Sequence, residues 1–210
     1  MRDLKAFWDK VSANYDKQSG GKYADAYQQT ITLSKDHLKS SDIALDFACG
    51  TGITTIPLSR YVKEMDAIDI SPAMLALAAK KATENGTENI RFLTGQIFDT
   101  SLKQNHYDVV MAFNVLYFFE DIPAVLNRIK SLLKSDGIFL SATDCLGKQN
   151  RLINFMSKLL YRVGILPYMN KISEKDLKAM FENAGFEILF EKSLYDAPVN
   201  YYAAAKNSGK

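Results

Sequence analysis

The sequence of 210 residues has little cysteine, no excess of one charge and no long apolar run. Its two cysteines, Cys49 and Cys145, are too few for the disulfide framework of a small secreted protein and fit a reducing compartment. The 26 basic and 24 acidic residues nearly cancel, so composition predicts no strong attraction to nucleic acid. The sequence contains no run of about 18 apolar residues, which a spanning helix would need, and its N-terminal residues lack the apolar core of a signal peptide. We therefore expect a cytoplasmic protein without stable membrane insertion.

Hydrophobic residues make up 47% of the chain, which is ordinary for a globular protein and argues against disorder. The length suggests one domain with room for a small appendage. The sequence has only two histidines, His37 and His106, and no group of His, Cys or carboxylate residues has the spacing of metal ligands. We therefore expect no bound metal.

Short apolar runs alternate with helical patterns from residue 42 onward, which is typical of βαβ units and a mostly parallel sheet. The last two strands are joined by only seven residues, Ser193 to Val199, so they should pair antiparallel. The pattern predicts a doubly wound α/β fold with helices on both faces of the sheet. The expected strands cover residues 43–47, 65–70, 90–93, 107–113, 138–142, 186–192 and 200–205, and the expected helices cover residues 54–61, 71–84, 121–133 and 173–184.

Two helical segments stand outside this alternation, one over residues 1–40 and one over residues 146–170. In the second segment apolar residues recur at helical spacing, which favours a helix packed on the core. The segment follows the carboxyl edge of the sheet, where ligands bind in open α/β folds, so a lid over a ligand site is the second interpretation. Basic residues beside the apolar stripe keep a membrane-surface helix open as the third. The basic residues are Lys148, Arg151, Lys158 and Arg162, and the apolar residues are Leu152, Phe155, Met156, Leu159, Leu160 and Val163.

A turn of small residues, 48–52, follows the first expected strand and lets the backbone approach a ligand closely. Asp69 ends the second strand, 17 residues after Gly52, where a carboxylate can accept two hydrogen bonds from a ribose diol. The third glycine of a dinucleotide turn is absent at residues 53–55, and no nearby Lys or Arg would hold a pyrophosphate. Asp46 would repel a phosphate but suits a cationic amino group.

Residues 46–52, Asp-Phe-Ala-Cys-Gly-Thr-Gly, resemble the first motif of class I S-adenosylmethionine-dependent methyltransferases, D/E-x-G-x-G-x-G. Ala48 departs from this motif at the first glycine, and we expect the loop to tolerate the loss of one methyl group of clearance. Residues 7–16, from Phe-Trp-Asp to Tyr-Asp, also look like the front helix of the small-molecule members. The resemblance covers roughly residues 40–206, and its further segments lie at residues 69–75, 95–99, 107–118 and 132–137.

The resemblance implies a seven-stranded sheet in the order 3-2-1-4-5-7-6, with the last strand antiparallel. It also implies that residues 1–210 form a single methyltransferase domain with S-adenosyl-L-methionine as cofactor. Within that domain it predicts an N-terminal helical cap at 1–40, a cofactor-binding core at 41–145, a helical lid insertion at 146–170, and a C-terminal helix with a β-hairpin at 171–206.

The same resemblance implies roles for individual residues around the cofactor. Asp46 would hold the ammonium group, directly or through water, and Asp69 would accept hydrogen bonds from the ribose diol. The remaining residues implied are Ala48, Cys49, Gly50, Thr51 and Gly52 at the methionine and ribose, Ile70, Met74, Gln96 and Ile97 at the adenine, and Phe113, Asn114 and Val115 near the sulfonium.

The methyl acceptor is less well defined by the sequence. We identify no catalytic base, and a base is needed only for a poorly acidic nucleophile. Tyr15, Tyr117 and Tyr161 are candidates for contact with the acceptor. Near-neutral charge argues against nucleic acid, and apolar residues in the insertion favour a small, partly apolar acceptor methylated on O, N or C. We expect a monomer or a homodimer.

Two other functions stay open at this point. A nicotinamide-dependent oxidoreductase would use the same Asp69, although the missing phosphate features and the terminal hairpin count against it. A non-catalytic protein that binds S-adenosylmethionine or S-adenosylhomocysteine and acts through a partner would fit Ala48, Gln96 and the lack of an obvious base.

Overall fold

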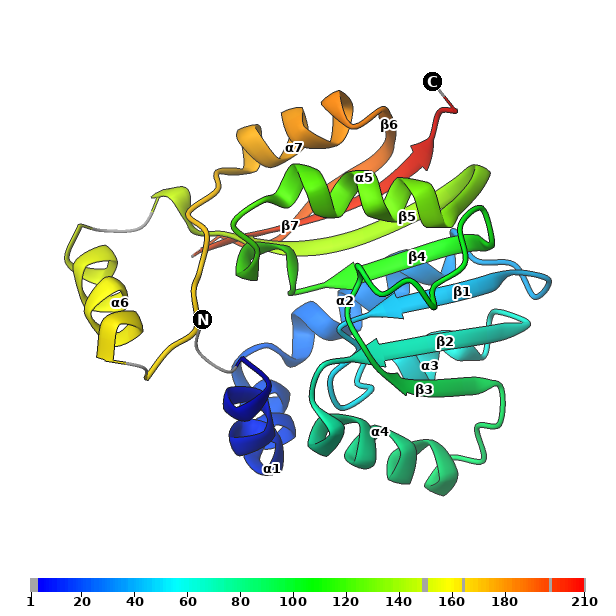
Figure 1. The fold of residues 1–210 in the computed structure, drawn as a ribbon, viewed down its shortest axis with the longest axis horizontal. Helices are drawn as coiled ribbons and strands as arrows, with labels where there is room; N and C mark the ends of the chain where they lie inside the picture. The colour runs from blue at the N-terminus through cyan, green and yellow to red at the C-terminus, as the bar shows by residue number, and fades with distance from the viewer. Residues whose placement is uncertain (1–3, 149–150, 164, 197, 210) are drawn as a thin grey trace.

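Seven strands form one sheet over the described residues of the computed structural model, which are 4–148, 151–163, 165–196 and 198–209. Their order is β3-β2-β1-β4-β5-β7-β6 (Figure 1). Neighbouring strands are parallel as far as β5, and β7 is antiparallel to both β5 and β6. This topology confirms the predicted fold. The strands are β1 (Ile43–Phe47), β2 (Glu64–Asp69), β3 (Ile90–Thr94), β4 (Tyr107–Phe113), β5 (Leu133–Cys145), β6 (Phe186–Asp196) and β7 (Val199–Asn207).

The C-terminal strands are longer than the sequence pattern predicts. β6 and β7 run almost to the tip of their hairpin, so most of the expected seven-residue connection is itself strand. β5 begins at Leu133 instead of Ile138, because the polar turn before Gly137 is an irregularity within the strand. Asp136 adopts a φ of 64° at this point, a conformation that Asp tolerates better than most residues.

Helix starts follow the capping residues that the sequence offers. Ser71 Oγ accepts a hydrogen bond from Met74 N at 3.1 Å at the start of α4, and Asp121 accepts one from Ala124 N at 2.9 Å at the start of α5. The helix expected at residues 54–61 is shorter and forms α3. The described helices are α1 (Leu4–Lys22), α2 (Ala24–Lys35), α3 (Thr55–Ser59), α4 (Pro72–Glu84), α5 (Ile122–Leu132), α6 (Arg151–Val163) and α7 (Glu174–Asn183), with single 3₁₀ turns at η1 (Leu116–Phe118) and η2 (Leu146–Lys148).

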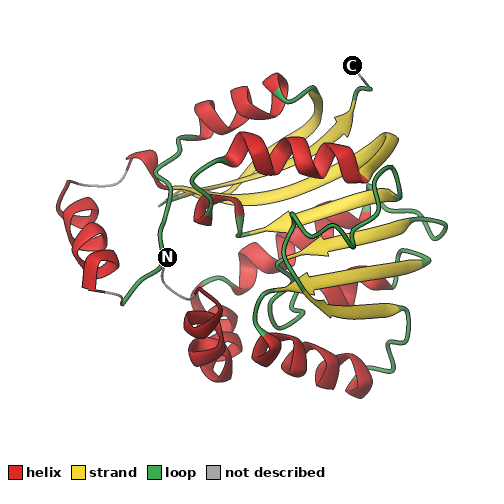
Figure 2. Cartoon of the chain, viewed as in Figure 1, coloured by secondary structure: helices red, strands yellow, loops and turns green. Residues whose placement is uncertain are grey.

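The sheet has a hydrophobic core on each face, because successive side chains of a strand point to opposite sides. Leu45 and Phe47 of β1 belong to the core that also contains buried residues of α5 and α7. Ala44, which precedes Leu45 and points to the opposite face, packs in the second core with Leu58 of α3. Figure 1 shows α5 and α7 over one face with α2 and α3 behind the other, and Figure 2 shows the same layers by type of structure.

Two helices lie outside these layers. α1 packs beside α4, whereas α6 projects away from the sheet (Figure 1). Most of the apolar side chains that the structure describes on α6 are exposed, with 64% of Phe155, 44% of Leu159 and 59% of Val163 accessible. The expectation that this helix packs on the core is therefore wrong, because its apolar stripe meets solvent. None of the helices over the described residues is long and apolar enough to cross a bilayer.

Candidate functional site

The turn after β1 is built from residues with left-handed backbone conformations. Ala48, Gly50 and Gly52 have φ angles of 59°, 55° and 79°. A Cβ on Gly52 would lie 3.1 Å from the Ile56 side chain and 3.3 Å from Ala78, so this glycine lets α3 and α4 pack closely. A Cβ on Gly50 would meet nothing within 4 Å, so its bare backbone faces open space.

Ala48 changes the expectation about this turn. Clearance for one methyl group is not the whole cost, because an L-residue at φ 59° also strains the backbone. Such a conformation costs a non-glycine residue about 1–2 kcal/mol. The turn therefore keeps the glycine-type conformation although the residue is alanine.

A cavity of about 530 Å³ opens beside this turn, at the carboxyl ends of β1, β2 and β4. Ligands of open α/β sheets bind at this edge. Its lining includes the predicted residues Tyr15, Ala48, Gly50, Asp69, Ile70, Met74, Gln96, Phe113, Asn114 and Val115. The other residues that line it are Leu4, Lys5, Trp8, Phe47, Thr94, Gly95, Asp99, Phe118 and Phe119.

Asp69 stands at the end of β2 with both carboxylate oxygens oriented by backbone. Oδ2 accepts a hydrogen bond from Gly50 N, and Oδ1 accepts one from Ser71 N, each at 2.9 Å. Burial raises the pKa of this carboxyl group, whereas the backbone N–H groups lower it. Each oxygen has a second lone pair, so the carboxylate can still accept two hydrogen bonds from a diol in the cavity.

Asp46 lies one layer deeper and is 1% exposed. Its Oδ2 accepts a hydrogen bond from the Thr55 hydroxyl at 2.6 Å, and within the described part of the chain no basic side chain offsets its charge. Burial, with a smaller effect from the nearby Asp69, raises its pKa to about 7. It lines a second hollow of about 30 Å³ that shares Ala48, Gly50 and Asn114 with the large cavity. The site thus has a buried carboxylate that lacks a cation.

Five predicted cofactor residues, Asp46 among them, do not line the large cavity. Cys49 and Thr51 line the small hollow with Asp46, and Gly52 serves helix packing. Ile97 is fully buried in the core beneath α5, so it presents no surface to a ligand. The expectation that Ile97 covers the adenine ring is not met in this structure, because the backbone turns its side chain inward. Its neighbour Asp99 lines the cavity instead and accepts a hydrogen bond from Gln96 N at 2.8 Å.

Helix α1 forms the front wall of the cavity through contacts that sequence analysis missed. The Ser71 hydroxyl donates to Asp9 Oδ1 at 2.6 Å, and the Thr51 hydroxyl donates to Asp16. Lys81 of α4 pairs with the other oxygen of Asp16 at 2.7 Å. These contacts place Trp8 at the cavity, although no local pattern pairs residues so far apart in sequence.

The three tyrosines predicted near the acceptor have different positions. Tyr15 lines the cavity, and its hydroxyl lies 3.2 Å from the Tyr27 hydroxyl. Tyr117 stacks against Phe118 with ring centroids 4.3 Å apart, and burial raises its pKa well above the ordinary range. Tyr161 lies on α6, packs edge-on against Tyr168 and does not line the cavity.

A polar network at the ends of β4 and β5 was also missed. Asn200 Nδ2 donates to Asn114 Oδ1 at 3.0 Å and to Asp144 Oδ1 at 2.7 Å. The Tyr195 hydroxyl donates to the same Asp144 oxygen at 2.5 Å. The electrostatic neighbours of Tyr117 include Asp144 and Tyr195, so this network adjoins the tyrosines. Only the position of Asp144 at the carboxyl end of a parallel strand could have indicated it from sequence.

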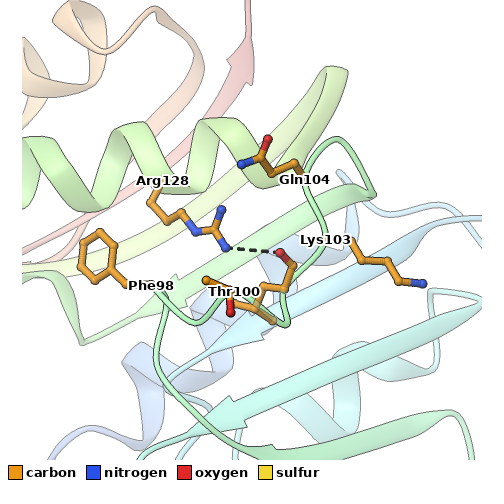
Figure 3. Close-up of a pocket in the computed structure, with 6 residues that line it drawn as sticks. Phe98, Thr100, Lys103, Gln104 and Arg128 are labelled. Atoms are coloured by element: carbon orange, nitrogen blue, oxygen red, sulfur yellow. Dashed lines mark hydrogen bonds between the residues drawn. The ribbon is translucent and has the colours of Figure 1, made fainter.

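A further hollow, of about 450 Å³, lies away from the glycine turn and is lined in part by Arg128 (Figure 3). The guanidinium of Arg128 is already hydrogen-bonded to backbone carbonyl groups. It donates to the carbonyl oxygens of Ile97 at 3.0 Å, Asp99 at 2.9 Å and Leu102 at 3.2 Å. Arg128 therefore anchors the loop that carries Gln96 to helix α5.

Comparison with known proteins agrees with this geometry. Residues 38–185 match the family model described as a methyltransferase domain. The uncharacterized methyltransferase YcgJ of Bacillus subtilis is 22% identical over 89% of this chain and 73% of its own length. The malonyl-[acyl-carrier protein] O-methyltransferase of Acetivibrio thermocellus is 30% identical over 67% of this chain, which spans about half of that relative (48%). An S-adenosylmethionine-dependent methyltransferase from Aquifex aeolicus shares the fold, with a TM-score of 0.70, 16% identity, and coverage of 93% of this chain and 97% of that one.

A seven-stranded sheet of this order with a strained glycine-type turn defines the class I fold of methyltransferases that use S-adenosylmethionine. The chain belongs to the methyltransferase domain family. Its site fits that cofactor: Gly50 leaves its backbone open to the cavity, and the buried carboxylate of Asp46 has no basic partner in the described part of the chain and suits an ammonium group. The lining holds one basic side chain among the described residues, Lys5, and its ammonium pairs with Asp9 at 2.7 Å. This lining therefore has few basic groups that could bind a pyrophosphate.

Proposed function

We propose that this methyltransferase acts on a small, partly apolar acceptor that enters between α1 and the polar network of Asp144. The observation that carries the proposal is that two regions of the site, with different kinds of side chain, meet at Asn114. On one side lie the cavity lined by Asp69 and the adjoining small hollow lined by Asp46, and on the other lie Asn200, Asp144 and Tyr195. Asn114 has a φ of 56° and ends β4 between them.

The cofactor half would be held by the residues of the turn and the two aspartates. Asp46 would meet the ammonium group, directly or through water, and Asp69 would accept from the ribose diol. Gln96 and Asp99 would stand at the adenine end, with Met74 and Ile70 on its flanks. The bound cofactor supplies a methyl group made electrophilic by the sulfonium. The protein's own task is to exclude water and align the acceptor.

The acceptor half is apolar and aromatic where it meets the cavity. Trp8 packs edge-on against Phe118 with centroids 5.3 Å apart, and both line the cavity with Phe119. These rings suit a flat or hydrocarbon-rich acceptor and leave little room for water. Charged macromolecular acceptors find few partners in this wall, because the basic residues of the described surface are not gathered around it.

In the half of the site that would bind the methyl acceptor, Asp144 is the group that would take up a proton. It receives hydrogen bonds from Tyr195 and Asn200, which fix the orientation of its carboxylate. Through Asn200 it is connected to Asn114 at the rim of the cofactor cavity. An acceptor hydroxyl bound here would pass its proton to Asp144 as the new bond to carbon forms. The relative named as an O-methyltransferase supports an oxygen nucleophile.

Two measurements test this proposal in order. The first is calorimetric titration with S-adenosylhomocysteine and, in parallel, with NAD. We expect binding of the former alone, weakened at least about tenfold by Asp69→Asn through loss of charge-assisted hydrogen bonds. Asp66→Asn is the matched control, since Asp66 lies on the same strand but pairs with Arg91 at 2.7 Å away from the cavity. Binding of NAD alone would overturn the assignment of the cavity.

The second measurement is transfer of labelled methyl groups to a panel of small hydroxyl, amine and carbon-acid acceptors. We expect turnover on at least one small acceptor and none on tRNA or protein. Asp144→Asn should lower kcat more than KM for a hydroxyl acceptor and leave S-adenosylhomocysteine affinity unchanged. Tight cofactor binding without turnover on any acceptor would favour a non-catalytic protein that acts through a partner.

A further inference from the structure

Helix α6 presents an apolar face that nothing in the described structure covers. Phe155, Leu159 and Val163 follow one another at intervals of four residues and so share one side of the helix. Met156 and Ile165 extend this exposed set, with 45% and 59% of their surfaces accessible. A contiguous exposed apolar face of this kind marks an interaction surface. Figure 1 shows the helix standing apart from the sheet and its covering helices.

The charge of the surrounding segment is one-sided. Residues 146–172 include five basic residues and no acidic residue, although the whole chain carries a formal charge of only +2. The rest of the chain therefore carries −3. A helix that combines an apolar face with basic residues is typical of proteins that lie on membrane surfaces. The five basic residues are Lys148, Arg151, Lys158, Arg162 and Lys171.

We propose that α6 docks the protein on an anionic membrane surface, with its apolar face in the headgroup region and its basic residues facing lipid phosphates. The charge distribution carries this choice of partner. Each basic residue gains from the negative surface potential, while the net negative remainder of the chain is repelled, so α6 is the face that approaches. The helix has 13 residues, a length of about 20 Å, which is too short to span a bilayer but sufficient to lie in its surface.

A second copy of the chain is a poorer partner for this face. A two-fold dimer through α6 would set the same basic segment against itself, because both subunits use the same patch. Like charges brought together in this way oppose association. A lipid surface offers both apolar depth for the exposed face of α6 and negative charge for the basic segment around it.

Docking at α6 also has a physical connection to the cavity. The segment that follows α6 is fixed by Asn170, whose backbone N–H donates to the Tyr117 carbonyl at 2.6 Å and whose Nδ2 donates to the Phe119 carbonyl at 3.1 Å. Phe119 lines the cavity. Docking at α6 would therefore place the membrane surface beside a segment that is hydrogen-bonded to the wall of the cavity. This inference goes beyond the proposed function, and its test requires no turnover.

The test is flotation of the full chain with vesicles of phosphatidylcholine alone or with about 30% phosphatidylglycerol. We expect binding to the anionic vesicles that falls as salt is raised, and little binding to the neutral ones. Phe155→Gln with Leu159→Gln should weaken partition at least about tenfold by removing buried apolar area. Lys158→Gln and Arg162→Gln should each weaken it about fivefold. Leu189→Gln is the matched control, because Leu189 is an exposed apolar residue on β6, away from α6, and its change should leave partition unaltered.

The affinity for S-adenosylhomocysteine is measured on every variant to confirm that each one folds. If the unmodified protein itself does not bind S-adenosylhomocysteine, that result counts against the proposed function alone. Absence of binding to anionic vesicles by protein that still binds S-adenosylhomocysteine would overturn the docking proposal. Equal partition of the Phe155→Gln, Leu159→Gln variant would also overturn it. A dimer that light scattering detects in the unmodified protein, and that these two changes dissociate, would overturn it as well, since α6 would then be covered by a second copy.

Discussion

The Asp9 carboxylate of α1 accepts a hydrogen bond from the Ser71 hydroxyl at 2.6 Å, while Ser71 itself caps α4 through Met74 N. The same Asp9 oxygen lies 3.3 Å from Ala73 N. The front helix is thus tied to the N-terminus of the helix that begins next to Asp69. An acidic side chain is favourable there because the N-terminus of a helix carries partial positive charge. Through this contact α1 and the end of β2, which both line the cavity, are held together.

We predict that Asp9→Ala loosens α1 and weakens S-adenosylhomocysteine binding several-fold, while the sheet keeps its stability. The change removes the acceptor for the Ser71 hydroxyl and the partner of Lys5, so α1 loses its polar attachment to the start of α4. Hydrogen exchange should show faster exchange of the α1 amides than of the β1 and β4 amides. Asp25→Ala on α2, an acidic residue of the same type on the next helix, is the control. Unchanged exchange in α1 would show that Asp16 and apolar packing suffice.

The helices, the strands and the antiparallel last pair follow from sequence because they depend on local periodicity, turn length and capping, whereas the order of the strands was implied only by the family resemblance. Ser71 and Asp121 are read directly as helix starts, and the short link between the last strands requires an antiparallel pair. Asp46 and Asp69 could also be singled out from sequence, since they lie in the last residues of two apolar strands at the expected binding edge.

Contacts between distant segments could not be predicted in this way. The Thr51 hydroxyl meets Asp16, 35 residues earlier, through packing of α1 that no local pattern encodes. Ile97 and Asp99 occupy the same loop, and only the anchored backbone decides that Ile97 turns into the core while Asp99 faces the cavity. The apolar stripe of α6 has the pattern of a core helix, so its exposure is a feature that periodicity alone misreads.

Ala48→Gly should stabilise the protein by about 0.5–1 kcal/mol. The backbone at φ 59° is strained for alanine, and relief of about 1–2 kcal/mol exceeds the extra conformational entropy that glycine loses on folding. Urea denaturation measures the difference. Gly52→Ala is the opposing control and should be clearly destabilising, because its φ is 79° and a new Cβ would crowd Ile56. A destabilised Ala48→Gly variant would show that the alanine methyl contributes packing that outweighs the strain.

Arg128→Met should lower the free energy of unfolding by about 2–3 kcal/mol, because three backbone carbonyls lose a charged donor. Methionine keeps much of the side-chain volume, so the effect reports the hydrogen bonds. Since Asp99 and Gln96 belong to the anchored loop, S-adenosylhomocysteine affinity should fall as well. Arg60→Met, at an exposed position that ends α3, is the control and should stay within about 0.5 kcal/mol. Equal stability of the two variants would remove the anchoring role.

Asp46 should make cofactor binding depend on pH near neutrality. Its pKa of about 7 means that the ligand-free protein holds a proton there at pH 6, whereas an ammonium group requires the carboxylate. Affinity for S-adenosylhomocysteine should therefore rise up to about tenfold per unit between about pH 5.5 and 7, with a proton released on binding. Calorimetry in two buffers of different ionisation enthalpy measures that proton, and Asp66→Asn should leave it unchanged.

The same carboxyl group should act in the opposite direction on stability. A folded-state pKa raised above the unfolded value of about 3.9 means that the native state holds more protons, so this group's contribution falls as pH rises from about 4 to 7. Asp46→Asn removes a buried charge that lacks a cation, and at pH 8 it should stabilise the ligand-free protein by about 1–3 kcal/mol. Yet it should weaken S-adenosylhomocysteine binding and abolish its pH dependence. A variant that loses stability at pH 8 and keeps the pH-dependent affinity would show that Asp46 is a packing residue, because only a carboxylate kept for a cationic ligand is costly without that ligand.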